Sequence, residues 1–160
     1  MKDAEALLKE QLKTGPAGAY LLYGEEPYLV DTYARQIARA ITPDPTDVFN
    51  HQQLDGEETT PEQLAQAVTA LPMLADKLCV SVRDMDLGAH SEAIVALLQE
   101  LPDSTVLVFR QVNRQPDRRK KGWQAVLKQL DAAGLAVAFP RRNPAQLQKI
   151  LIAGAKHRGC

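Results

Sequence analysis

The sequence predicts an α/β fold with a five-stranded parallel sheet and helices on both faces of that sheet. Five short apolar runs lie along the chain, and the segments between them carry apolar residues at the three- and four-residue spacing of amphipathic helices. Each connection is long enough for a helical crossover, which parallel strands require. The chain has 160 residues, 45% of them apolar, so it is long enough to bury one aliphatic core. Strands are expected before Gly24 and at residues 48–54, 78–82, 105–109 and 135–139.

Two helices are expected in the first quarter of the chain. Asp3 can cap a helix that ends at Gly15-Pro16. The helix after Gly24 has the most regular apolar stripe in the sequence, so we expect it to pack on the sheet. On the outer side of this helix, Asp31 and Arg35 have the four-residue spacing of an ion pair.

Three more helices are expected between the remaining strands. Thr60 begins a capping box, and the helix that follows is expected to carry Leu71 on its apolar face and to end at Pro72. The next helix precedes the fourth strand. Gln115-Pro116 is expected to open the third, with Gly134 at its C-terminal cap.

An acidic turn follows the first strand, at the point where P-loop proteins hold phosphate between a strand and a helix. A working loop needs a second glycine, a lysine and a Ser or Thr, but here Gly24 is followed by Glu25 and Glu26, whose charges repel a triphosphate. We therefore predict a degenerate nucleotide loop that needs no cofactor. The two carboxylates are better interpreted as first-turn acids of the next helix than as acid–base catalysts, because no matching histidine or metal cluster accompanies them.

Metal and disulfide chemistry have little support in the sequence. His157 and Cys160 are spaced like two metal ligands, but a metal site needs about four and no second cluster exists. Cys79 and Cys160 lie too far apart in sequence to suggest a disulfide framework. Asp84 and Asp86 follow the third strand, where P-loop enzymes hold magnesium, yet they would have no nucleotide to serve.

Charge and hydropathy narrow the function further. The net charge is −1, so any contact with nucleic acid must come from a local patch rather than from the overall field. No apolar run reaches the roughly 18 to 20 residues that cross a bilayer, and the polar N-terminus is not a signal peptide. We expect a cytoplasmic protein that does not interact with membranes.

Four segments carry a resemblance to a known family. They are YLLYGEEPYL at residues 20–29, LDGEE at 54–58, LPMLADKLCVSVR at 71–83 and LVF at 107–109. In this order and spacing they resemble the delta subunit of bacterial DNA polymerase III, which opens the sliding clamp within the clamp loader. The resemblance implies an AAA+ fold without a functional nucleotide site, in a component of the DNA-directed DNA polymerase III holoenzyme, a nucleotidyltransferase complex, that has no catalytic site of its own.

The resemblance also implies a domain division. Residues 1–140 would form the AAA+-like domain, and residues 141–160, with a helix from Pro144, would begin a helical lid that is truncated here. The alternative is a terminal helix docked on the sheet. The implied partners are the sliding clamp, the ATPase and stator subunits of the loader, mainly through regions missing here, and primed DNA through the assembled loader; the implied location is the cytoplasm, in association with the nucleoid.

The candidate clamp-binding residues are Leu71, Pro72, Met73 and Leu74. Because the proline breaks the helix, Met73 and Leu74 fall on a loop, where apolar side chains are usually unwelcome. The resemblance implies that this pair is the family's hydrophobic wedge, which enters a pocket on the clamp. The alternative is that both side chains fold into the core beneath the third strand.

A basic cluster is a second, weaker candidate site. Arg114, Arg118, Arg119, Lys120 and Lys121 gather near the start of a predicted helix. Such a cluster can bind phosphate, but it is more often a solvated face, and a helix start favours anions over cations. Arg141 and Arg142 are interpreted as linker charges.

The sequence thus favours a binding protein that opens the sliding clamp during bacterial DNA replication and does not hydrolyse ATP. Two alternatives are an atypical P-loop nucleotide hydrolase and a stator-type clamp-loader subunit. The first lacks the loop lysine, and the second usually carries a zinc-binding cysteine cluster that this sequence does not have.

Overall fold

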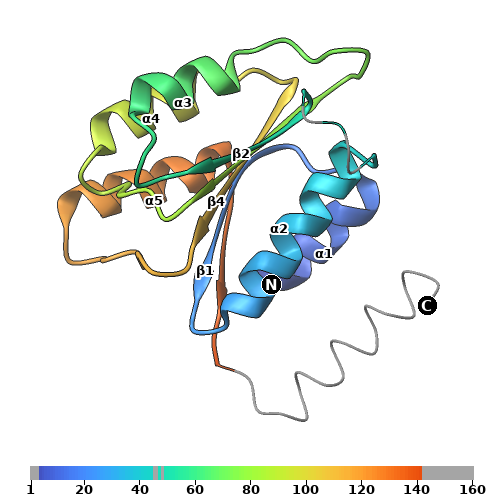
Figure 1. The fold of residues 1–160 in the computed structure, drawn as a ribbon. Helices are drawn as coiled ribbons and strands as arrows, with labels where there is room; N and C mark the ends of the chain where they lie inside the picture. Colours follow the sequence, from blue (N-terminus) through green and yellow to red (C-terminus); the bar gives the residue numbers. More distant parts are fainter. Residues whose placement is uncertain (1–3, 45–46, 48, 142–160) are drawn as a thin grey trace.

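The computed structural model describes residues 4–44, 47 and 49–141, which form a five-stranded sheet with helices on both faces (Figure 1). The strand order is β2-β3-β4-β1-β5, and every neighbouring pair is parallel. The predicted fold class is confirmed. The elements are α1 (Ala4–Thr14), β1 (Gly18–Gly24), α2 (Pro27–Ile41), β2 (His51–Asp55), α3 (Pro61–Val68), β3 (Leu78–Arg83), α4 (Ser91–Gln99), β4 (Thr105–Gln111), α5 (Lys121–Ala133) and β5 (Gly134–Phe139).

Two apolar clusters hold the helices to the sheet. On one face, α1 and α2 cover β1, β4 and β5, with Leu29, Val30 and Ile37 fully buried. On the other face, α3, α4 and α5 pack together, with Ile94 and Trp123 among the buried side chains. Figure 1 shows the two helical layers on opposite sides of the strands. β4 is buried along nearly its whole length, as its uninterrupted apolar run predicts.

The third helix ends earlier than its sequence predicts. The expected capping box at Thr60 is present, but α3 stops at Val68, and Leu71 is exposed rather than on a buried helix face. In a longer helix the Val68 carbonyl would accept a bond from the N–H of residue 72, which is proline and has none. The Thr105 hydroxyl donates to that carbonyl instead, at 2.6 Å.

Two other local predictions were wrong. The last helix begins at Lys121, not at Gln115-Pro116, because Gln115 is held against the ends of β1 and β4. Asp31 of α2 does not pair with Arg35 on the same helix. It pairs with Arg110 of the underlying strand β4, whose Nη1 lies 3.2 Å from the Asp31 Oδ1. The partly buried partner on the strand offers a less hydrated ion pair than the exposed one on the same helix.

Gly134 is the C-terminal cap of α5, as predicted, and it is also the first residue of β5. Its φ of 178° is extended, so the glycine is required by space and not by conformation. A Cβ at this position would lie 1.6 Å from the Ala19 carbonyl oxygen of β1. The predicted helix from Pro144 lies outside the described residues.

Candidate functional site

The turn after β1 is too short to cradle a phosphate. Only Glu25 and Glu26 separate Gly24 from the first residue of α2, whereas a P-loop spans roughly eight residues whose N–H groups surround the ligand. The Glu25 N–H donates to the Phe139 carbonyl at 2.9 Å. Gly24 has a φ of +130°, and a Cβ there would lie 2.3 Å from the Phe139 oxygen. The end of β5 therefore closes over this turn.

Side chains from the loop between β4 and α5 form hydrogen bonds at the end of β1. Gln115 accepts the Gly24 N–H at 2.9 Å and donates to the Gln111 and Val112 carbonyls. Arg118 donates to the Tyr23 hydroxyl at 3.1 Å. The predicted degenerate loop is thus closed by bonds within the protein, in addition to being acidic.

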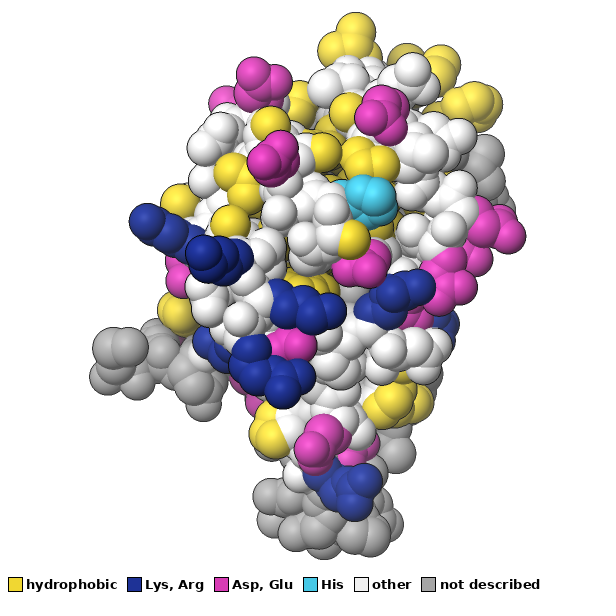
Figure 2. All heavy atoms as spheres, turned by 90° about the vertical axis from the view of Figure 1, so that its left-hand side faces the viewer, with side chains coloured by type: hydrophobic (Ala, Val, Ile, Leu, Met, Phe, Trp, Pro, Cys, Tyr) yellow, Lys and Arg dark blue, Asp and Glu magenta, His cyan; other side chains and the backbone are white. Residues whose placement is uncertain are grey.

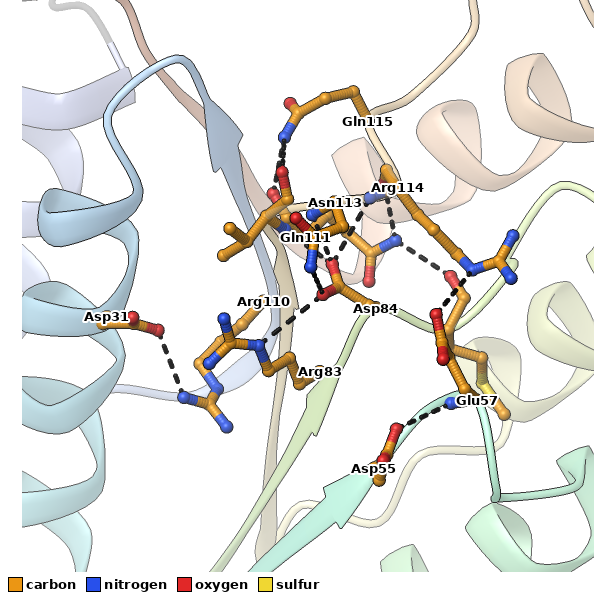
Figure 3. A network of polar contacts seen from close by, with 12 residues as sticks. Asp31, Asp55, Glu57, Arg83, Asp84, Arg110, Gln111, Asn113, Arg114 and Gln115 are labelled. Carbon is orange, nitrogen blue, oxygen red and sulfur yellow. Dashed lines mark hydrogen bonds and ion pairs between the residues drawn. The ribbon is translucent and has the colours of Figure 1, made fainter.

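Asp84, one of the two candidate magnesium ligands, has a structural role (Figure 3). It is buried at the end of β3, and its Oδ1 accepts the N–H groups of Val112 and Asn113 at 2.7 and 2.8 Å and of Arg114 at 3.4 Å. Its Oδ2 accepts from the Asn113 side chain at 3.2 Å. The carboxylate therefore fixes the β4–α5 loop and has little capacity left for a metal ion.

Asp86, the second candidate, lies at the rim of the same network. It accepts the Ala89 N–H and pairs with Arg114 at 3.5 Å, and Arg114 also pairs with Glu57 at 3.7 Å. Among the described residues, no three His, Cys, Asp or Glu side chains gather in a way that could hold a metal ion. His157 and Cys160 lie outside the described residues.

An open cleft of about 410 Å³ lies at the carboxyl ends of β2, β3 and β4. Two of its three carboxylates are on β2 and the turn that follows, and its two arginines are on β3 and β4. The Arg110 guanidinium is tied to Asp31, and Arg83 lies 3.6 Å from Asp84. The cleft is lined by Gln53, Leu54, Asp55, Glu57, Arg83, Asp84, Arg110 and Asn113. The three carboxylates outnumber the two arginines, which does not favour a phosphorylated ligand.

The basic cluster lies mostly in the loop before α5 rather than on the helix. Figure 2 shows several Lys and Arg side chains across the middle of one face, with Asp and Glu side chains among them. Arg119 makes a two-point contact with Asp117, at 3.0 and 3.2 Å, and this hydrogen bond lowers the pKa of Asp117. Arg118 is bonded to Tyr23. Lys120 and Lys121 extend the exposed basic surface toward α5.

The loop between α3 and β3 exposes the candidate clamp-binding residues at the opposite end of the sheet. Leu71 is 83% exposed, Met73 is 55% exposed and Leu74 is fully exposed, while Pro72 is half-buried. In Figure 1 this loop projects at the top, beyond the amino end of β3, and Figure 2 shows apolar side chains protruding there. The alternative in which Met73 and Leu74 fill the core is wrong.

The backbone of this loop is held in a defined shape. Leu74 has a φ of +56°, a left-handed conformation that is uncommon for a bulky residue without glycine's freedom. Such strain persists only where neighbouring contacts impose it, and it clusters at functional positions. Two contacts flank it: Met73 is bonded to Asn50, and the Lys77 ammonium donates to the Pro16 carbonyl at 3.1 Å.

The Asn50 side chain bonds to both backbone groups of Met73, as the backbone of a neighbouring strand would. Its buried carboxamide donates to the Met73 carbonyl at 2.7 Å and accepts the Met73 N–H at 2.7 Å. Asp47 in turn accepts from the Asn50 side chain and from the N–H groups of Phe49 and Asn50. These bonds, those from Asn50 first, lower the pKa of Asp47.

Phe49 and Asn50 were missed as candidate residues from the sequence. Both fall inside the strand predicted at residues 48–54, but β2 begins only at His51. Phe49 is 66% exposed beside the loop that Asn50 holds. The available signal was Asp47 followed by Asn50, a pattern typical of side-chain-bonded turns.

The family profile described as DNA polymerase III, delta subunit, matches residues 20–138 of this chain. The chain belongs to this family. The match covers both ends of the sheet described above, including the closed turn after β1 and the exposed loop before β3. Comparison with curated protein sequences gives no match.

Solved structures share the fold at low sequence identity. The chain is similar to the Bacillus subtilis DNA clamp loader delta protein, with a TM-score of 0.69 and 21% identity over 96% of this chain and 47% of that one. It is also similar to a DNA polymerase III gamma subunit-related protein from Thermotoga maritima, with a TM-score of 0.59 and 18% identity over 92% and 48%. The chain spans about half the length of these structures.

A third solved structure shares the same fold. The ORC2 protein of Aeropyrum pernix, determined in ADPNP and ADP complexes, has a TM-score of 0.56 and 15% identity over 96% of this chain and 51% of its own. The shared architecture is the AAA+-like sheet with helices on both faces. Within residues 4–44, 47 and 49–141, no helix is long and apolar enough to cross a membrane.

Proposed function

We propose that this chain binds the DNA polymerase sliding clamp through Leu71, Pro72, Met73 and Leu74, and that this binding opens the clamp ring. The exposure of three large apolar side chains on one short loop carries the proposal. Leaving such side chains in water forfeits roughly 1.5 to 3 kcal/mol each relative to burial, and a partner that covers them recovers that free energy.

The mechanism is differential binding. A clamp whose interface is open exposes a pocket for Met73 and Leu74 that the closed ring fits less well, so binding shifts the equilibrium toward the open form. The shift cannot exceed the difference in affinity between the two forms. The bonds from Asn50 and Lys77 support this mechanism because a loop already held in shape loses less conformational entropy on binding.

ATP is handled by other subunits in this proposal. The turn at Gly24, Glu25 and Glu26 supports that division of labour, because the N–H groups of Gly24 and Glu25 are bonded within the protein and the two glutamate side chains are acidic. The subunit therefore acts without a catalytic site of its own, as a component of the DNA polymerase III holoenzyme. Its other contacts, with ATPase and stator subunits, would form mainly through the part of the relatives that this chain does not match.

The proposal extends to domain organisation and to DNA. Residues 1–140 form the clamp-binding domain, and residues 141–160 begin a helical lid. Primed DNA would reach the protein through the assembled loader. Lys120 and Lys121 are the members of the basic cluster best placed to contact it, because Arg118 and Arg119 already bond to Tyr23 and Asp117.

The experiment is to titrate the chain into the sliding clamp of the same organism and to follow two signals. Binding is measured by isothermal titration calorimetry, and ring opening by the fluorescence of a dye pair placed across the clamp interface. We expect saturable binding and a loss of energy transfer, both without ATP. Absence of binding contradicts the proposal, and binding without a change in energy transfer contradicts the opening step.

A further inference from the structure

The exposed apolar side chains of this protein are unevenly distributed. Six large ones are exposed among the described residues, and four of them lie in two segments at the amino end of β2 and β3. Leu71, Met73 and Leu74 belong to the α3–β3 loop, and the fourth is Phe49, from the turn before β2. The other two, Leu7 and Tyr28, lie on α1 and at the start of α2.

We propose that Phe49 is part of the clamp-binding surface and supplies an aromatic anchor beside Met73 and Leu74. This proposal rests on the proposed function of the α3–β3 loop. It adds a residue that lies 24 positions before Met73 in the sequence and is not part of the α3–β3 loop. The binding surface would then be formed by two segments of the chain.

The backbone geometry brings the two segments together. β2 and β3 are parallel neighbours, with His51 opposite Cys79, and the Cys79 N–H donates to the Asn50 carbonyl at 2.7 Å. The pairing continues past the strand ends through the two bonds between the Asn50 carboxamide and Met73. Phe49 therefore directly precedes Asn50, whose side chain both donates to and accepts from the Met73 backbone.

The backbone of Phe49 is also held by bonds within its own turn. Its N–H donates to the Asp47 carboxylate at 3.1 Å, and the same carboxylate accepts from the Asn50 N–H at 2.9 Å. The turn thus fixes the backbone of Phe49 while its ring stays in water. A fixed backbone with an exposed aromatic ring is the arrangement in which association costs the least ordering entropy and covers the most apolar area.

The occupant that fits this surface is the apolar pocket of the sliding clamp that receives Met73 and Leu74. Aromatic residues and methionine are enriched at the centres of protein interfaces, and the anchors of an interface cluster together. A partner that covers Met73 passes over the Asn50 contact and so reaches Phe49. The charged side chains on the two segments are partly engaged within the protein, Asp47 with Phe49 and Asn50 and Lys77 with the Pro16 carbonyl.

The test compares Phe49→Ala with Tyr28→Ala, an aromatic residue of similar exposure that lies at the opposite end of the sheet. We expect Phe49→Ala to weaken clamp binding about tenfold or more, mainly through faster dissociation, with unchanged melting. Tyr28→Ala should bind as the unmodified chain does. Phe49→Trp should retain binding, and its emission should shift to the blue when the clamp is added, against the constant background of buried Trp123.

The outcomes separate this inference from the function on which it rests. If the unmodified chain binds the clamp, and Met73→Ala weakens binding while Phe49→Ala does not, the two-segment surface is wrong and the proposed function stands. If the Trp at position 49 shows no spectral shift in a formed complex, the inference also fails. If the unmodified chain does not bind at all, both fail.

Discussion

At one end of the sheet the side chains form hydrogen bonds within the protein, whereas at the other end apolar side chains are exposed to water. At the carboxyl ends of the strands, Asp84, Gln115 and Arg118 are bonded to neighbouring loops, and the turn after β1 is closed. At the amino ends of β2 and β3, Met73 and Leu74 extend into water, although the backbone that carries them is fixed. In doubly wound α/β folds the ligand site lies at the carboxyl ends. Here the turn after β1 is internally bonded and the cleft beside it is polar, whereas most of the exposed large apolar side chains lie at the other end.

A few local features account for this difference. The turn after β1 is short and acidic, β5 pairs as far as Gly24 and Phe139, and a glutamine of the neighbouring loop bonds to the turn. At the other end, α3 stops at Val68, and Asn50 ties the loop that follows to the turn before β2. Both sets of features lie outside the core of the sheet, whose strand order is β2-β3-β4-β1-β5.

The largest effect is expected at the bonded end. Replacing Asp84 by Ala leaves the N–H groups of Val112 and Asn113 without their acceptor and removes the anchor of the β4–α5 loop. We expect a loss of about 3 kcal/mol in the free energy of unfolding, measured by urea denaturation.

Asp84→Asn and Asp86→Ala are the controls. Asparagine keeps one carbonyl acceptor and tolerates the left-handed φ of +55° at this position, so it should cost less than alanine. Asp86→Ala removes a half-exposed ion pair and one exposed bond from the Ala89 N–H, so it should cost about 1 kcal/mol or less. Equal losses for Asp84→Ala and Asp86→Ala would contradict the structural role of Asp84.

The second prediction concerns Asn50, which joins the two segments at the other end. Asn50→Ala removes both bonds to Met73, so we expect faster hydrogen exchange of the Met73 amide and a loss of about 1 to 2 kcal/mol in stability. Asn50→Asp keeps an acceptor for the Met73 N–H, but it loses the donor and places a second carboxylate beside Asp47, so it should protect that amide only weakly. An unchanged exchange rate in Asn50→Ala would show that the loop keeps its shape without Asn50.

A smaller, pH-dependent effect is expected at His51. Burial first, and then the charge of Arg110, lower the pKa of His51 below its ordinary value of 6.5 in the folded protein. Between these two pKa values the unfolded chain binds more protons, so stability should fall as the pH decreases through 6.5 and level off below the folded-state pKa. Thermal melts from pH 7.5 to 5 should show this slope, and His51→Gln should flatten it. A stability that rises toward acid over this range would mean that the pKa is raised instead.

Adding a glycine and a lysine to the turn after β1 is not expected to create a nucleotide-binding site. Glu25→Gly with Glu26→Lys supplies a glycine and a lysine, but the turn stays two residues long and the Gly24 N–H remains bonded to Gln115. Titration with a fluorescent ATP analogue and magnesium should give no saturable signal for the unmodified or the substituted chain. Micromolar binding by either would overturn the view that this turn is closed to phosphate.

Much of the fold follows from local patterns. The strands at residues 78–82, 105–109 and 135–139 and the capping box at Thr60 could be predicted because each depends on side chains close in sequence. The end of α3 could be predicted only in part, because Pro72 is close in sequence but the Thr105 hydroxyl that bonds to the Val68 carbonyl is 37 residues away. The partner of Asp31 was missed for the same reason.

Some residues of the candidate site could likewise be predicted from the sequence, and others could not. Met73 and Leu74 could be identified from the proline before them and from the resemblance. Phe49 and Asn50 could not, because their significance arises only when β2 and β3 become neighbours and Asn50 reaches Met73. The acidic turn at Gly24 predicted an impaired phosphate site, but its closure by Gln115 depends on a contact 91 residues away in sequence.

The most direct test of the account is the double substitution of Met73 and Leu74 by Ala, with clamp binding and melting measured on the same preparation. Because both side chains are exposed, the free energy of unfolding should change by about 0.5 kcal/mol or less, whereas clamp binding should weaken by roughly 2 kcal/mol or more, about thirtyfold. Buried side chains would instead cost about 2 to 5 kcal/mol each in stability. A chain that melts at much lower temperature while its folded fraction still binds the clamp would contradict the account.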